Sequence, residues 1–273
     1  MGAGFLISIG EPLFHSDPEG LIGKQALRGR RAFQVDVAMP PSLTLYELTG
    51  ADDDLRFSPH CWKIRMALLH KGLEADRRPW RFTEKDAIAF SGGATVPVLV
   101  DGDKTVTDSW RIALHLEEHH ADRPSLFGSE TGRSYARFVN SYADTVLVAP
   151  LRHLLTLDIL ARVHEKDRDY FRASREKRFG QPLETHAGDP AVHIPAFRAA
   201  LTPVRTVVAE QPFLSGAAPA YADYCAFGAL MWARCVSPLR LLEKDDPVYG
   251  WRERMLDAFG GHARAAACTE QDA

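Results

Sequence analysis

The chain has 273 residues, of which 45% are hydrophobic and 25% charged, and its formal net charge is −3. This length is enough for one large or two modest domains with proper cores. No half of the chain is strongly basic, which argues against a nucleic-acid partner, and no apolar run approaches the ~20 residues of a membrane span. The four cysteines have neither metal-ligand spacing nor the density of a disulfide scaffold, so a cytoplasmic protein without a bound metal is expected.

The first segment, residues 1–38, shows no clear periodicity. It lacks a basic region before its apolar residues and a small-residue cleavage site, so no signal peptide is expected. Met39 stands just before the first predicted strand and would itself be a natural start. We therefore expect residues 1–38 to be a disordered extension or the product of a misassigned start site.

From residue 43 the pattern alternates between strand and helix. An Asp-Gly-Asp turn at residues 101–103 predicts a hairpin, and the whole unit reads βαβ, then α, then ββα. This order predicts a compact α/β domain over residues 39–121. Its predicted strands are 43–48, 74–80, 96–100 and 104–107, and its predicted helices are 59–71, 84–90 and 108–119.

After residue 124 the pattern becomes helical only, with loops rich in Gly, Pro and Asp between the apolar segments. This pattern predicts an all-helical second domain over residues 130–262, without internal repeats. Its predicted helices are 130–155, 167–179, 194–210, 221–236 and 247–259.

Ser58 stands directly before the first predicted helix, and Pro59 suits a first helical turn. The free N–H groups and the dipole of a helix N-terminus favour an anion. A hydroxyl at this position can donate a hydrogen bond to a thiolate and help to keep it ionised. The alternative is that Ser58 is only an N-cap, as most serines before helices are.

Two further features of the α/β unit fit a ligand site. Pro97 opens a strand, where proline cannot donate to the ladder, which suits a cis Val96–Pro97 bond that turns the backbone of Val96 toward a ligand. Asp108 and Ser109 precede the last helix of the unit, where free N–H groups suit a carboxylate. The plainer alternatives are a trans proline on an edge strand and ordinary capping.

Taken together, these motifs resemble the glutathione transferase superfamily, in which a thioredoxin-like α/β domain precedes an all-helical domain. The resemblance covers about residues 43–260. It is carried by Ser58-Pro59-His60-Cys61-Trp62, Val96-Pro97-Val98-Leu99, Asp108-Ser109-Trp110-Arg111-Ile112-Ala113 and Ala220-Tyr221-Ala222-Asp223-Tyr224. The last motif matches the family's capping box, except that Ala220 replaces the usual Ser, Thr or Asn, a change that costs ~1 kcal/mol of stability.

The resemblance implies glutathione as co-substrate and a role for each matched residue. Ser58 would be catalytic, holding the glutathione sulfur as a thiolate. Val96, beside cis-Pro97, would pair its backbone with the cysteinyl part. Asp108 and Ser109 would bind the γ-glutamyl end, with Ser109 at its carboxylate.

Within the superfamily, the Ser-Pro-x-x-Trp start and residues 167–176 are most similar to bacterial β-aryl etherases and their fungal etherase-like relatives. The resemblance thus implies attack on an electrophilic, aromatic substrate. The spacing of Trp62 and Arg65 is also similar to the zeta class, which isomerises maleylacetoacetate. A non-catalytic glutathione-binding or interaction protein is a third alternative, because the fold also serves as a binding module.

Cys61 offers a competing chemistry, because Ser58-Pro59-His60-Cys61 is a Cys-x-x-Cys motif whose first cysteine is replaced. Without that nucleophile, disulfide exchange is not expected and Cys61 is predicted to point into the core. The family further implies a homodimer and a small-molecule electrophile. It places the electrophile's pocket between the domains, near residues 142–154 and Trp232.

Overall fold

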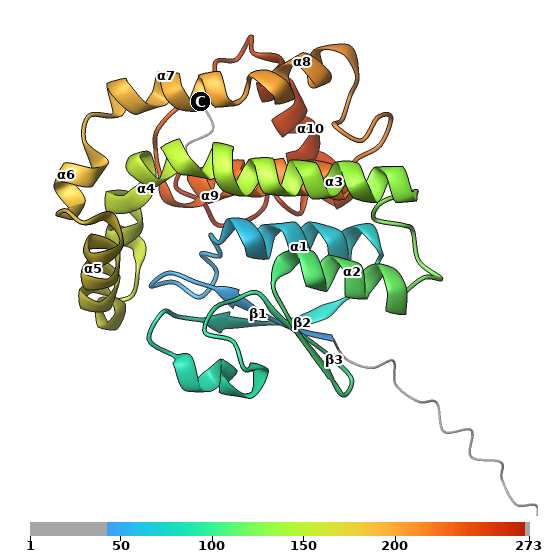
Figure 1. The fold of residues 1–273 in the computed structure, drawn as a ribbon, viewed down its shortest axis with the longest axis horizontal. Coiled ribbons are helices and arrows are strands. Elements are labelled where there is room, and N and C mark those ends of the chain that lie inside the picture. The colour runs from blue at the N-terminus through green and yellow to red at the C-terminus, as the bar shows by residue number, and fades with distance from the viewer. Residues whose placement is uncertain (1–42, 271–273) are drawn as a thin grey trace, which may run out of the picture. The chain divides into compact units, whose positions relative to one another are not determined.

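The computed structural model describes residues 43–270, in which a four-stranded sheet with its helices is followed by helices only (Figure 1). The predicted fold class, a thioredoxin-like α/β domain and then an all-helical domain, is confirmed. The expected disordered extension, residues 1–38, lies outside the described residues. The domain boundaries 39–121 and 130–262 stay a prediction.

The first part of the chain contains the elements in the predicted βαβ, α, ββα order. They are β1 (Leu43–Leu48), α1 (Pro59–His70), β2 (Ala75–Trp80), the 3₁₀ helix η1 (Lys85–Ser91), β3 (Val98–Asp101), β4 (Lys104–Thr107) and α2 (Ser109–His119).

The second part is helical, and none of the helices within residues 43–270 has the length and apolar character that a membrane span requires. Its elements are α3 (Glu130–Tyr142), the π-helical segment η2 (Ala143–Leu147), α4 (Val148–Arg162), α5 (Glu165–Phe179), α6 (Leu183–Ala187), α7 (Pro190–Ala200), α8 (Thr202–Glu210), α9 (Tyr221–Val236) and α10 (Pro247–Gly261).

The sheet has the strand order β2-β1-β3-β4, in which only β1 and β2 are parallel. Residues of β1 alternate between buried and half-buried, as one core-facing side requires. Glu47 lies on the buried side, where a bare carboxylate would be costly. It accepts hydrogen bonds from Arg65 Nε (3.0 Å) and Nη2 (2.8 Å), which tie β1 to α1.

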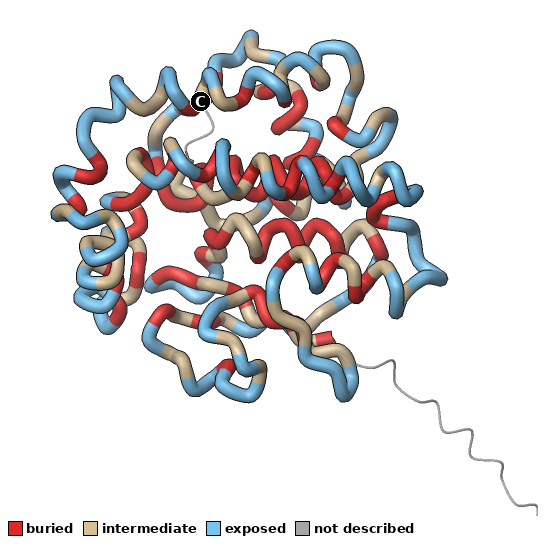
Figure 2. The backbone as a smooth tube through the Cα atoms, viewed as in Figure 1, coloured by how far each residue is buried: buried red, intermediate tan, exposed pale blue. Residues whose placement is uncertain are grey.

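The two parts of the chain meet where α9 packs on α1, and Figure 2 shows both helices largely buried. The contact is close at Gly228, because a Cβ there would lie 2.5 Å from the carbonyl oxygen of Pro59. Glycine is therefore the residue that lets α9 reach the first turn of α1.

Asp223 organises the N-terminus of α9. Its buried carboxylate accepts hydrogen bonds from the backbone N–H groups of Leu214 (2.7 Å), Ser215 (3.1 Å) and Ala220 (3.2 Å), and from Trp251 Nε1 (2.9 Å). Burial raises the pKa of Asp223, and these donors oppose that shift. Ala220 caps no N–H with its side chain, so only the reciprocal half of the capping box is made.

Two predicted helices are interrupted, each near a proline. The predicted helix 130–155 contains the π-helical segment Ala143–Leu147, just before Pro150. A proline ring clashes with the carbonyl four residues earlier, and that carbonyl belongs to this segment. The predicted helix 194–210 divides at Leu201, two residues before Pro203, and its first half begins earlier, at Pro190.

Candidate active site

Ser58 makes the N-cap bond and also faces a cavity. Its Oγ accepts a hydrogen bond from the N–H of Cys61 at 3.3 Å, and only 4% of the residue is exposed. Ser58 can therefore be both an N-cap and a donor to a thiolate. Its hydroxyl oxygen accepts a hydrogen bond from the helix, and its proton remains free to be donated.

The Val96–Pro97 peptide bond is cis, as expected from the sequence. Val96 is half-buried and lines the same cavity as Ser58. Pro97 is buried and comes directly before β3, which lies inside the sheet, so the edge-strand alternative is wrong. The ladder loses no bond, since pairing of β3 begins at Val98.

Asp108 and Ser109 begin α2, and neither lines the cavity that contains Ser58 and Val96. Asp108 is the N-cap, with a φ of 73°, and its Oδ1 accepts from the N–H of Arg111 at 3.1 Å. Ser109 is 4% exposed, and its carbonyl accepts a hydrogen bond from Tyr221 Oη at 2.9 Å. The structure therefore places Ser58, before α1, and Val96, before β3, in one cavity, and Asp108 and Ser109 outside it at the start of α2.

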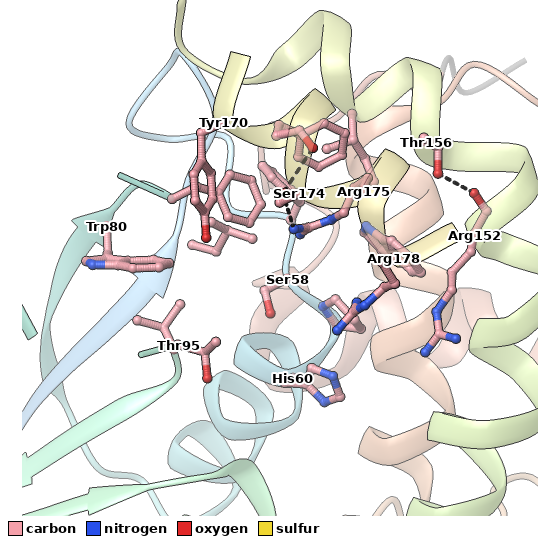
Figure 3. A pocket seen from close by; sticks show the side chains of 18 of the residues that line it. Ser58, His60, Trp80, Thr95, Arg152, Thr156, Tyr170, Ser174, Arg175 and Arg178 are labelled. Carbon is pink, nitrogen blue, oxygen red and sulfur yellow. Dashed lines mark hydrogen bonds between the residues drawn. The ribbon is translucent and has the colours of Figure 1, made fainter. Parts of the chain in front are cut away.

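The cavity has a volume of about 620 Å³ and lies between the sheet domain and the helices (Figure 3). One wall carries Ser58 and Val96, and the other is formed by α4, α5 and Trp232. Val148 and Trp232, which lie where the electrophile's pocket was predicted, line this cavity, whereas α5 was not expected there. The aromatic side chains among the lining residues are Phe57, Trp80, Phe82, Tyr170, Phe171, Phe179 and Trp232.

A buried cation holds α1 to the π-helical segment. Lys63 is 1% exposed and donates from Nζ to Asp144 Oδ1 (2.6 Å) and Asn140 Oδ1 (2.9 Å). His60 Nδ1 lies 3.6 Å from the same Asp144 oxygen. Loss of hydration lowers the pKa of His60, Lys63 lowers it further, and Asp144 and Asp108 oppose the shift. His60 is therefore neutral at pH 7.

Cys61 points into the core, as predicted, and is 1% exposed. Burial raises the pKa of its thiol to about 12, so almost no thiolate is present at neutral pH. We expect Cys61→Ala to leave any glutathione-dependent turnover within about twofold of the wild type, because the thiolate is the reactive species. Steady-state kinetics checks this, and a loss beyond tenfold in a folded variant would restore the redox alternative.

The cavity also contains basic side chains that were not among the predicted site residues. The cavity is lined by Lys85, Arg152, Arg175 and Arg178, and by no Asp or Glu. Arg175 belongs to the run 167–176 that carries the etherase resemblance, but nothing in the sequence indicated that it or the other three residues would line a cavity.

Models of the two domains of one family match this chain. The glutathione S-transferase N-terminal domain matches residues 57–119, and the glutathione S-transferase C-terminal domain matches residues 135–259. Both agree with the observed order of a four-stranded sheet domain and a helical domain. The chain belongs to the glutathione S-transferase superfamily.

The individual relatives that match this chain share less than a third of its residues over the matched segments. Glutathione S-transferase Z1 of Arabidopsis thaliana is 28% identical over 109 residues, which cover 38% of this chain and 48% of that protein. The chain thus spans about half the length of the curated relatives it matches.

Two fungal crystal structures share the fold over most of the described chain. GSTFuA2 from Phanerochaete chrysosporium has a TM-score of 0.65 at 26% identity, covering 81% of this chain and 93% of that one. A glutathione S-transferase of Ceriporiopsis subvermispora, CsGST63524, solved in complex with glutathione, has a TM-score of 0.68 at 23% identity, covering 80% and 96%.

Proposed function

We propose that this protein is a glutathione transferase in which Ser58 stabilises the glutathione thiolate for attack on an electrophile. The observation that carries the proposal is the position of Ser58, at the N-terminus of α1 and facing the cavity between the domains. Glutathione-bound relatives of the same fold support glutathione as the co-substrate.

The other predicted site residues would make the remaining contacts with glutathione. Val96 would pair its backbone with the cysteinyl part, beside cis-Pro97, and Asp108 and Ser109 would hold the γ-glutamyl end at the start of α2. The N-terminal N–H groups of a helix suit a carboxylate there. A thiol pKa lowered by about two units requires ~2.7 kcal/mol of preferential thiolate stabilisation.

For the second substrate we propose an aromatic, β-aryl ether-like electrophile, which the aromatic side chains of the cavity support. The sulfur would bond to the ether-bearing carbon while the C–O bond breaks and the aryloxide leaves with a proton from solvent. The zeta-class relatives favour a glutathione-dependent isomerase as the alternative. Product analysis separates the two, because only the etherase consumes glutathione. A homodimer in the cytoplasm remains our expectation.

Calorimetry with reduced glutathione tests the proposal first. We expect saturable micromolar-to-millimolar binding by the wild type, and loss of binding by at least about tenfold in Asp108→Ala combined with Ser109→Ala, since charged hydrogen bonds are removed. Absence of binding by the wild type would refute the transferase proposal and leave only the shared fold.

The double variant needs a control, because Asp108 also caps α2. Asp108→Asn keeps a side-chain acceptor and tolerates the positive φ. It should retain the helix while weakening contact with the γ-glutamyl ammonium. A variant with normal stability and full affinity would show that Asp108 is a cap only.

A further inference from the structure

The cavity has an unusual charge for this chain, which contains 33 basic and 36 acidic residues. Its lining contains four basic side chains and no carboxylate. Lys85 is engaged, since its Nζ donates to the carbonyl of Ala94 at 2.9 Å and lies 4.6 Å from the ring centre of Trp80. The other three basic side chains, Arg152, Arg175 and Arg178, differ from Lys85 in how they are paired.

No carboxylate within residues 43–270 pairs with the guanidinium of any of these three arginines. Arg175 donates to Ser174 Oγ at 3.1 Å and lies over the rings of Phe82 and Phe171, which are no counter-ions. Figure 3 shows Arg175, Arg178 and Arg152 extending from the helical wall toward the space across from Ser58 and His60.

The contrast with Arg172 shows that α5 can pair its arginines. Arg172 lies outside the cavity and binds Glu176 at 3.0 Å and Glu184 at 2.8 Å. Burial lowers the pKa of Arg175 and the charge of Arg178 lowers it further, while Tyr170 opposes the shift, so within residues 43–270 no carboxylate offsets the repulsion between the two cations. An anion in the cavity would relieve this repulsion.

We infer that the cavity selects an aromatic electrophile that carries a carboxylate, bound by the guanidinium groups of Arg152, Arg175 and Arg178. Guanidinium groups match the planar geometry of a carboxylate, and the neighbouring aromatic side chains accept the rest of the molecule. The inference rests on the proposed function, in which Ser58 holds the attacking sulfur on the opposite wall.

Glutathione also has carboxylates, so the test must separate the two substrates. We would compare 4-chloro-3,5-dinitrobenzoate with its neutral amide, in both of which the thiolate sulfur bonds to the chlorine-bearing carbon and chloride leaves. Each variant is compared with the wild type on the same compound, so that intrinsic reactivity cancels.

For Arg178→Gln and Arg152→Gln we expect kcat/KM for the benzoate to fall about 10- to 100-fold, as for a lost charged hydrogen bond, and that for the amide to stay within about twofold. Arg178→Lys should retain part of the preference. Arg172→Gln is the matched control on the same helix and should change neither substrate.

A rise in KM for glutathione with the neutral amide would assign the arginines to glutathione and overturn the inference. An equal fall in kcat/KM for the benzoate and for the amide would also overturn the inference. Independently of turnover, calorimetry without glutathione should show 4-nitrobenzoate binding at least about tenfold more tightly than 4-nitrobenzamide, and Arg178→Gln should remove the difference. This arm decides the inference even if glutathione does not bind, and no difference in the wild type would refute it.

Discussion

Ser58→Ala is expected to lower kcat/KM with glutathione about 10- to 100-fold, because one to two pKa units of thiolate stabilisation are lost, or ~1.4–2.7 kcal/mol. Glutathione affinity should change little, since Val96, Asp108 and Ser109 make the other proposed contacts. The direct measurement is an ultraviolet titration of bound glutathione, in which the thiol pKa should rise by the same one to two units.

The cap at the start of α1 complicates this test, because the Ser58 Oγ also accepts from the N–H of Cys61. Removing that bond costs ~1 kcal/mol of stability whatever the chemistry. Ser58→Thr retains both cap and hydroxyl and should keep most of the activity. An alanine variant that is less stable but leaves the bound thiol pKa unchanged would reduce Ser58 to a structural residue.

Asp223→Ala is expected to lower the free energy of unfolding by about 3–5 kcal/mol, the largest stability effect we foresee. The carboxylate satisfies four donors, of which the Leu214 N–H and the Trp251 indole N–H are buried. A buried donor without its partner costs about 1–3 kcal/mol. Chemical denaturation, with the midpoint and the slope both compared, measures this loss.

Two substitutions bracket that result. Asp223→Asn keeps one acceptor oxygen and turns an amide N–H₂ toward the donors, so an intermediate loss is expected. Ala220→Ser restores the missing half of the capping box and should raise stability by about 0.5–1 kcal/mol. A loss below about 1 kcal/mol in Asp223→Ala would show that water replaces the carboxylate without penalty.

Much of the fold was predictable because its signals are local. The helix over Tyr221–Val236 matches its predicted bounds, since apolar spacing continues to both of its ends. The start of α1 followed from Ser58 and Pro59. The interruptions at Ala143–Leu147 and Leu201 were missed, although Pro150 and Pro203 carried a usable signal in the sequence.

The candidate site was less predictable, for a physical reason. Ser58, Val96 and Asp108 stand beside turns and helix starts, where the backbone conformation restricts the choice of residue. The arginines of α4 and α5 occupy ordinary helical positions, and only the packing of the helices turns them toward the cavity. The sequence had placed the pocket near residues 142–154 through family resemblance alone.

The contact of Gly228 with Pro59 limits which helical domains could replace the one in this protein. Helix α9 belongs to the helical domain, yet at Gly228 it lies directly against the carbonyl of Pro59, next to Ser58. Suppose that the sheet domain were joined to the helical domain of another protein. Any side chain at the position of Gly228 would then press on Pro59 and displace the neighbouring hydroxyl of Ser58. The two domains are thus not interchangeable modules, and an exchange retains the geometry of the serine only where the incoming helix also offers a glycine.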